Sequence, residues 1–127
     1  MILLLDTSTP VCHLTLVDDR QNGYEWQADR ELAKGLLRYI HTTLEKHNST
    51  WQNLSGIGVM KGPGSFTGLR IGMSVCNTLA DNLQIPIVGE TGDNWQAAAL
   101  ARLGAGENEK VVLPEYGRPA NITTPRK

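Results

Sequence analysis

The segment GPGSFTGLRIG, residues Gly62–Gly72, is the feature of this sequence that most constrains its fold. Four glycines and one proline stand within eleven residues, between a short apolar run and a stretch with helical periodicity. Glycine is favoured where the backbone needs a positive φ or comes very close to another group. The segment therefore predicts a tight joint between a strand and a helix. Its close neighbour would be a phosphate, another helix or a second protein chain.

Short apolar runs and amphipathic stretches give the order of elements around this joint. In the first helical stretch the apolar side chains fall in one arc, with Lys34, Arg38 and Glu45 on the opposite side. The predicted strands are Ile2–Leu5, Val11–Val17, Tyr24–Gln27, Ile57–Met60 and Ile87–Val88, and the predicted helices are about Glu31–His47, Ser65–Leu83 and Asn94–Leu103.

This order of elements restricts the topology of the sheet. The first three strands follow one another through short turns and can form an antiparallel meander, whereas the last two follow helices and join as parallel strands. The sequence therefore predicts an α/β fold with a mixed five-stranded sheet and covering helices. This is the arrangement of the ribonuclease-H-like lobe in the actin, hexokinase and sugar-kinase superfamily.

The composition excludes several classes of protein. A chain of 127 residues is expected to form one domain, and its net charge of −1 provides no general attraction to nucleic acid. Cys12 and Cys76 each lie in an apolar run, so we expect reduced thiols in the core. The apolar start of the chain ends at Asp6, and no stretch approaches the length of a membrane span. We therefore expect a cytoplasmic protein without a membrane partner.

Few residues are candidates for chemistry. The segment Asp6–Ser8 follows the first strand, where kinases of the superfamily hold Mg²⁺ and phosphate, but it also suits a strand-ending turn. The glycine joint lacks the Walker A spacing because Lys61 precedes the glycines. The histidines, His13, His41 and His47, have no metal-ligand spacing. We expect no catalytic residue, cofactor or metal. The sequence does not decide whether a weak nucleotide or anion site exists near Asp6 and Gly62–Gly68.

The second predicted helix carries more apolar surface than one sheet contact uses. Gly68, Gly72, Cys76 and Ala80 form a stripe of small side chains, and the apolar arc approaches twice the usual width of about 100°. The first helix also has a wide apolar arc. Either the two helices dock against a similar pair in a partner, or the second helix packs on the first. The predicted partner-binding residues are Leu32, Leu36, Tyr39, Thr43, Leu69, Gly72, Met73, Cys76 and Ala80.

Three segments resemble the TsaB (YeaZ) family: LLLDTST at the start, KGPGSFTGLRIGMSVCNTLA after the fourth strand, and LPEYGRP near the end. The resemblance covers about residues 1–103 and then Leu113–Pro119. It implies a non-catalytic scaffold that binds a TsaD-like catalytic subunit, with a TsaE-like ATPase in the complex. Such a scaffold supports threonylcarbamoyl transfer to the adenosine next to the anticodon of tRNA. The resemblance also implies a homodimer when the protein is alone, and an indirect or weak contact with tRNA.

The chain departs from this family after the third predicted helix. Family members have a second lobe where this sequence has GAGENEKV. We therefore expect a short form, with a lobe at residues 1–103 and a linker and tail at residues 104–127. The alternative function is a minimal nucleotide-binding enzyme of the superfamily that works as a homodimer. The tail, with Arg118, Arg126 and Lys127, contacts RNA or an acidic partner, or it is a plain solvated end.

Overall fold

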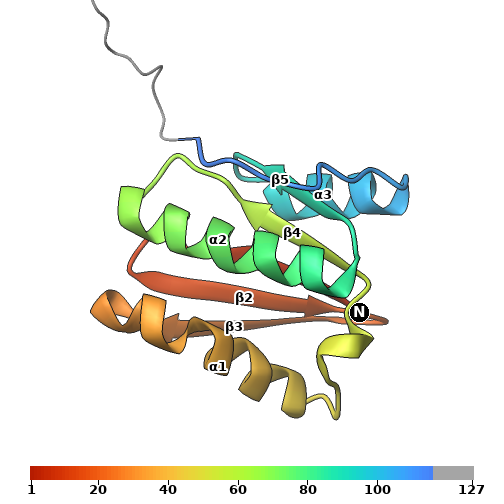
Figure 1. The fold of residues 1–127 in the computed structure, drawn as a ribbon, viewed down its shortest axis with the longest axis horizontal. Coiled ribbons are helices and arrows are strands. Elements are labelled where there is room, and N and C mark those ends of the chain that lie inside the picture. Colours follow the sequence, from red (N-terminus) through yellow and green to blue (C-terminus); the bar gives the residue numbers. More distant parts are fainter. Residues whose placement is uncertain (116–127) are drawn as a thin grey trace, which may run out of the picture.

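Five strands form one mixed sheet in the computed structural model, which describes residues 1–115 (Figure 1). The strands are β1 (Ile2–Asp6), β2 (Val11–Val17), β3 (Gln21–Gln27), β4 (Gly56–Met60) and β5 (Ile87–Glu90), in the spatial order β3-β2-β1-β4-β5. β1, β2 and β3 form an antiparallel meander, whereas β4 runs parallel to both β1 and β5. The predicted fold class and strand directions are confirmed.

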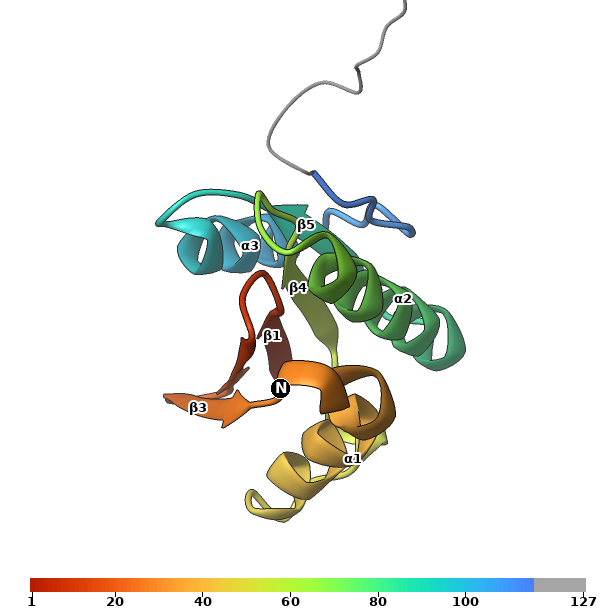
Figure 2. The same cartoon turned by 90° about the vertical axis from the view of Figure 1, so that its left-hand side faces the viewer.

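Helices cover both faces of this sheet (Figure 2). Helices α1 (Leu32–Glu45) and α2 (Phe66–Leu83) lie on one face, and α3 (Trp95–Gly104) lies on the other. Two short 3-10 helices, Asp29–Glu31 and Trp51–Asn53, precede α1 and β4. Within residues 1–115, every helix is too short or too polar to cross a membrane.

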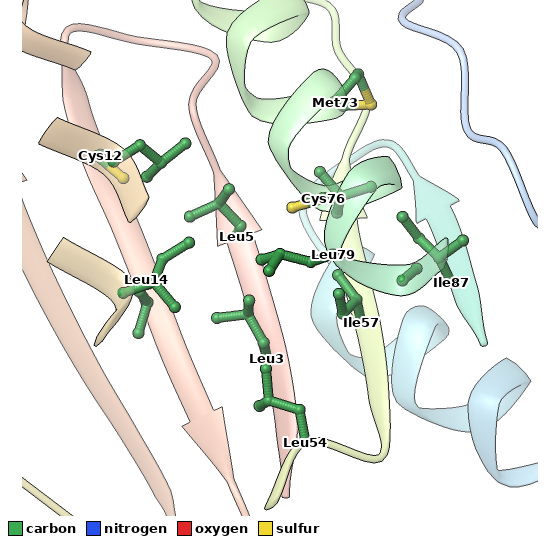
Figure 3. Packing of buried hydrophobic residues seen from close by; sticks show 14 of the residues in the cluster. Leu3, Leu5, Cys12, Leu14, Leu54, Ile57, Met73, Cys76, Leu79 and Ile87 are labelled. Atoms are coloured by element: carbon green, nitrogen blue, oxygen red, sulfur yellow. The ribbon is translucent and has the colours of Figure 1, made fainter. Parts of the chain in front are cut away.

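Strand β1 lies in the middle of the sheet and is buried from both sides. Leu3 and Leu5 belong to the core beneath α1 and α2, whereas Leu4 belongs to a second cluster beneath α3, together with Trp95. Figure 3 shows the first cluster, in which Leu79 of α2 points toward β1. A strand between two helical layers has no polar face, which explains the unbroken apolar run at the start of the sequence.

Strand β3 is longer than the sequence predicted. It begins at Gln21 and not at Tyr24, because the first residues of the strand pair with Val17, Leu16 and Thr15 of β2. Glutamine, asparagine and glycine have weak strand preferences, so pairing with a neighbouring strand decides their conformation here. The other predicted elements differ from the structure by at most two residues at each end.

Alkaline pH is expected to destabilise this core. Burial raises the pKa of Cys12 from 9.0 to about 12 and that of Tyr39 from 10.0 to about 12, and it also raises the pKa of the fully buried Cys76 thiol. The unfolded chain releases these protons at lower pH than the folded chain does. The free energy of unfolding should therefore be intact below about pH 9 and fall as the pH rises toward about 12, by up to about 1.4 kcal/mol per pH unit for each group.

Urea unfolding at a series of pH values measures this loss. A Cys76→Ala variant, compared with its own value at neutral pH, should lose less stability across the alkaline range than the original chain. Equal slopes for the two proteins would contradict the assignment of the loss to the buried thiols.

Residues 108–115, here called the edge strap, pack against the folded domain. Val112 is 1% exposed, and its backbone N–H and carbonyl oxygen bond the Asn77 side chain of α2, both at 2.9 Å. Near the end of the strap, Glu115 N–H donates to the carbonyl oxygen of Lys61. The sequence predicted a linker and tail at residues 104–127, and within this range Val112 of the strap belongs to the core. The predicted roles of Arg118, Arg126 and Lys127 lie outside the described residues.

The strap and α3 together close the outer edge of β5. Asn108 Oδ1 accepts a hydrogen bond from Ile87 N–H at 3.1 Å, and Glu109 N–H donates to the Ile87 carbonyl oxygen at 2.8 Å. Gly89 N–H donates to Glu109 Oε2 at 2.8 Å, and its carbonyl oxygen accepts from Arg102 at 2.9 Å. The edge of β5 is therefore bonded almost as if another strand lay beside it.

Arg102 of α3 holds this arrangement through three carboxylates. Its guanidinium lies 2.8 Å from carboxylate oxygens of Glu90, Glu107 and Glu109. The hydrogen bonds to Glu107 and Glu90 raise the pKa of Arg102 above its ordinary value, and burial opposes them. At the opposite side of the sheet, no described strand pairs with the outer edge of β3.

Candidate protein–protein interface

The glycine joint packs against the turn that follows β1. Helix α2 begins at Phe66, where Ser65 Oγ accepts a hydrogen bond from Gly68 N–H at 3.2 Å. A Cβ on Gly68 would lie 2.3 Å from the Thr7 carbonyl oxygen, and a Cβ on Gly72 would lie 2.2 Å from Thr7 Oγ1. The buried Thr7 hydroxyl donates to the Gly68 carbonyl oxygen at 2.7 Å. The close neighbour of these two glycines is therefore a turn of the same chain.

Asp6 is part of the same turn. Its Oδ1 accepts hydrogen bonds from the backbone N–H of Ser8 at 2.8 Å and from Ser8 Oγ at 2.6 Å. Ser65 N–H then donates to the Ser8 carbonyl oxygen at 2.7 Å, which ties the turn to the start of α2. The carboxylate thus has the strand-ending role that the sequence left as one of two interpretations. Nowhere in residues 1–115 do three His, Cys, Asp or Glu side chains gather as a metal site.

The side chains that the sequence assigned to a partner surface lie mostly in the core. Leu32, Leu36, Thr43, Leu69, Gly72, Met73, Cys76 and Ala80 are buried, and Tyr39 is half-buried. Figure 3 shows Met73 and Cys76 among the core residues around β1. Helix α2 contacts the sheet, α1, the turn after β1 and the edge strap, so neighbours within the chain cover the part of its apolar arc that holds these residues. These residues support the helices from beneath and do not line their exposed surface.

The exposed surface of α1 and α2 carries a different apolar set, here called the two-helix face: Ala33, Leu37, Phe66, Ile71 and Val75. Four of these residues line an open groove of about 510 Å³ between the helices, and Leu37 follows Ala33 by one turn of α1. Phe66 is 56% exposed and Leu37 is 51% exposed. The sequence signal for this face was the pair Ile71 and Val75, which flank the stripe of small residues.

The charge on the two-helix face is small and positive. The Arg70 guanidinium lies over the Phe66 ring, 5.5 Å from its centroid, in a cation–π arrangement. Thr67 and Ser74 supply the other polar groups, and among residues 1–115 no carboxylate lines the groove. The face therefore offers an apolar surface with one cation, which suits the apolar side of another helix.

Comparison with known proteins gives consistent matches. The sequence model of the family described as TsaD, tRNA N6-adenosine threonylcarbamoyltransferase, matches residues 26–110. The protein TsaB of Escherichia coli, named a tRNA threonylcarbamoyladenosine biosynthesis protein, is 30% identical over 131 residues, which cover 94% of this chain and 56% of that protein. The TsaB protein of Bacillus subtilis is 50% identical over 88 residues, which cover 68% of this chain and 38% of that protein.

A solved structure shows the same relationship in the fold. YeaZ from Pseudomonas aeruginosa superposes with a TM-score of 0.64 at 30% identity, over 71% of this chain and 44% of that one. The chain thus spans about half the length, or less, of the relatives it matches. The family match covers most of the described fold, including the glycine joint, α2 and α3. By its sequence and its fold, the chain belongs to the TsaD family and, within it, to the TsaB (YeaZ) proteins.

Proposed function

We propose that this protein is a non-catalytic subunit that binds a TsaD-like catalytic subunit through the two-helix face. In that complex, together with a TsaE-like ATPase, it supports threonylcarbamoyl transfer to the adenosine next to the anticodon of tRNA. The proposal places the protein in the cytoplasm. The observation that carries it is the exposure of Phe66 and Leu37 on neighbouring helices of a chain whose relatives are TsaB proteins.

The energetics of the two-helix face favour a partner. Apolar surface left in water costs about 25 cal/mol per Å², and here it is collected along two adjacent helices. A second helix pair of similar shape would cover this surface in a four-helix arrangement. A copy of this chain offers the same face, so the proposal includes a homodimer when the catalytic subunit is absent.

A supporting role fits the state of Asp6 better than a catalytic one. In the alternative function, Asp6 would have to hold Mg²⁺ and phosphate. Its Oδ1 is instead occupied by two hydrogen bonds from Ser8 that fix the turn under α2. A metal bound through Oδ1 would displace these bonds, and with them the turn whose Ser8 carbonyl oxygen accepts from Ser65 N–H at the start of α2.

Capture of the TsaD-like protein of the same source tests the proposal. Leu37→Asp and Phe66→Asp, made separately, should each weaken capture at least tenfold, because each replaces an apolar contact by a carboxylate that loses its water on binding. Both side chains are more than half exposed, so the variants should fold. The control is Ala97→Asp, the same kind of change at an exposed site on α3, across the sheet.

The control variant should capture the partner as the original chain does. If the original chain captures no TsaD-like protein, the proposed function is wrong. If Leu37→Asp and Phe66→Asp bind normally, the partner docks on another surface.

A further inference from the structure

A second groove lies between α1 and the edge strand β3, and it shares no lining residue with the groove of the two-helix face. Its volume is about 480 Å³, and the rings of Trp26 and Tyr39 are part of its lining. The two ring centroids are 5.0 Å apart, at an interplanar angle of 35°. We call this site the aromatic groove.

Gly35 allows the Trp26 ring to lie against α1. A Cβ at position 35 would approach the ring to 2.7 Å, so a larger residue would push the ring away from the helix. The Tyr39 hydroxyl is buried and has no hydrogen-bond partner among residues 1–115. The aromatic groove therefore displays the carbon surface of Tyr39 and not its hydroxyl group.

Two cations stand beside this aromatic surface. Lys34 and Arg38 line the groove one helical turn apart, and both are exposed. In the part of the chain that the structure describes, neither has a carboxylate partner. Glu31 also lines the groove, so the side chains that line it carry a net charge of +1, whereas the whole chain carries a net charge of −1.

We propose that the aromatic groove binds unpaired nucleotides of RNA, with a base stacked on Trp26 and Tyr39 and phosphates on Lys34 and Arg38. Stacking uses the flat aromatic surface, and the free cations neutralise the backbone that enters with the base. An acidic peptide would satisfy the cations but would leave the aromatic surface exposed. This proposal rests on the proposed function, since the RNA would be the tRNA that the complex modifies.

The test is binding of a fluorescent RNA hairpin with an unpaired loop to the full chain, alone and with its TsaD-like partner. Anisotropy is measured over a series of salt concentrations. The groove variant is Lys34→Glu with Arg38→Glu. The matched control is Arg20→Glu with Lys110→Glu, which makes the same change in charge at exposed residues elsewhere.

The groove variant should bind the hairpin at least tenfold more weakly than the matched control does. The dependence of the logarithm of its affinity on the logarithm of the salt concentration should be shallower by about 1.4, because two phosphate contacts are lost and each contact to a single strand contributes about 0.7. Duplex RNA without a loop should compete poorly, since stacking requires an unpaired base.

Equal losses in the two variants, or equal competition by duplex and hairpin, would overturn the proposal. Both variants leave the two-helix face unchanged and should capture the TsaD-like partner normally. If the original chain captures no partner, the proposed function fails, and the comparison of RNA affinities still decides whether the aromatic groove binds RNA.

Discussion

Replacing Gly72 by leucine is expected to lower the free energy of unfolding by about 1–3 kcal/mol. Even a Cβ at this position would lie 2.2 Å from Thr7 Oγ1, and leucine adds three more carbons in a fully packed place. Overpacking of this kind costs about 1–3 kcal/mol, and loss of the bond from Thr7 to Gly68 adds about 1 kcal/mol. The better helix propensity of leucine returns only about 0.8 kcal/mol. Urea unfolding gives the net value.

Two comparisons show whether Thr7 is the cause. Ser74→Leu adds the same side chain at an exposed position of α2 and should change stability by less than about 0.5 kcal/mol. In a Thr7→Ala background, Gly72→Ala should cost less than it does in the original chain, because only the Cβ of residue 7, at 3.2 Å, remains. A Gly72→Leu variant as stable as Ser74→Leu would show that Thr7 does not restrict this position.

Replacing Arg102 by methionine should destabilise the domain by about 2–3 kcal/mol. Methionine has an unbranched side chain like the aliphatic part of arginine, but it carries no charge. The carboxylates of Glu90, Glu107 and Glu109 then lie near one another without their shared cation. Most of the lost stability should come from the ion pairs with Glu90 and Glu109, because these two side chains, like that of Arg102, are about three-quarters buried. Glu107 is 51% exposed, and its ion pair should contribute little.

The loss should appear first in the edge strap. Amide hydrogen exchange at Glu109 and Val112 should become faster in the Arg102→Met variant before global unfolding is affected. Arg20→Met, at an exposed turn between β2 and β3, removes the same charge and should change stability by less than about 0.5 kcal/mol. If the two variants are equally stable, the three carboxylates do not depend on Arg102.

The sequence was sufficient for the sheet and its helices because their signals are local. Apolar runs, turn residues and helical periodicity lie within a few positions of one another. Ser65, for example, precedes α2 as its N-cap. The edge strap was missed because its main contact joins Asn77 to Val112, across 35 positions. Val112 lies in a run of only three apolar residues, 111–113, and so short a run has no periodicity that would indicate which side chain is buried.

The interface residues show a second limit of sequence patterns. Helical periodicity correctly indicated that α2 has more apolar surface than a sheet contact uses, but it does not indicate what covers that surface. Gly72 is 65 positions from Thr7, whose hydroxyl group occupies the space beside it. The buried set and the exposed set are interleaved on the same helices. Only the placement of neighbours distinguishes Met73, in the core, from Ile71, in the groove.

The unequal edges of the sheet limit how copies of this protein can assemble through their strands. A fibril grows only if each molecule offers two free strand edges, one for the molecule before it and one for the molecule after. Here β5 is occupied by the edge strap and Arg102, and only β3 is free among the described strands. Two copies that pair through β3 use up both free edges, so this kind of association ends at a closed pair. By occupying the edge of β5, the strap prevents aggregation by successive strand pairing.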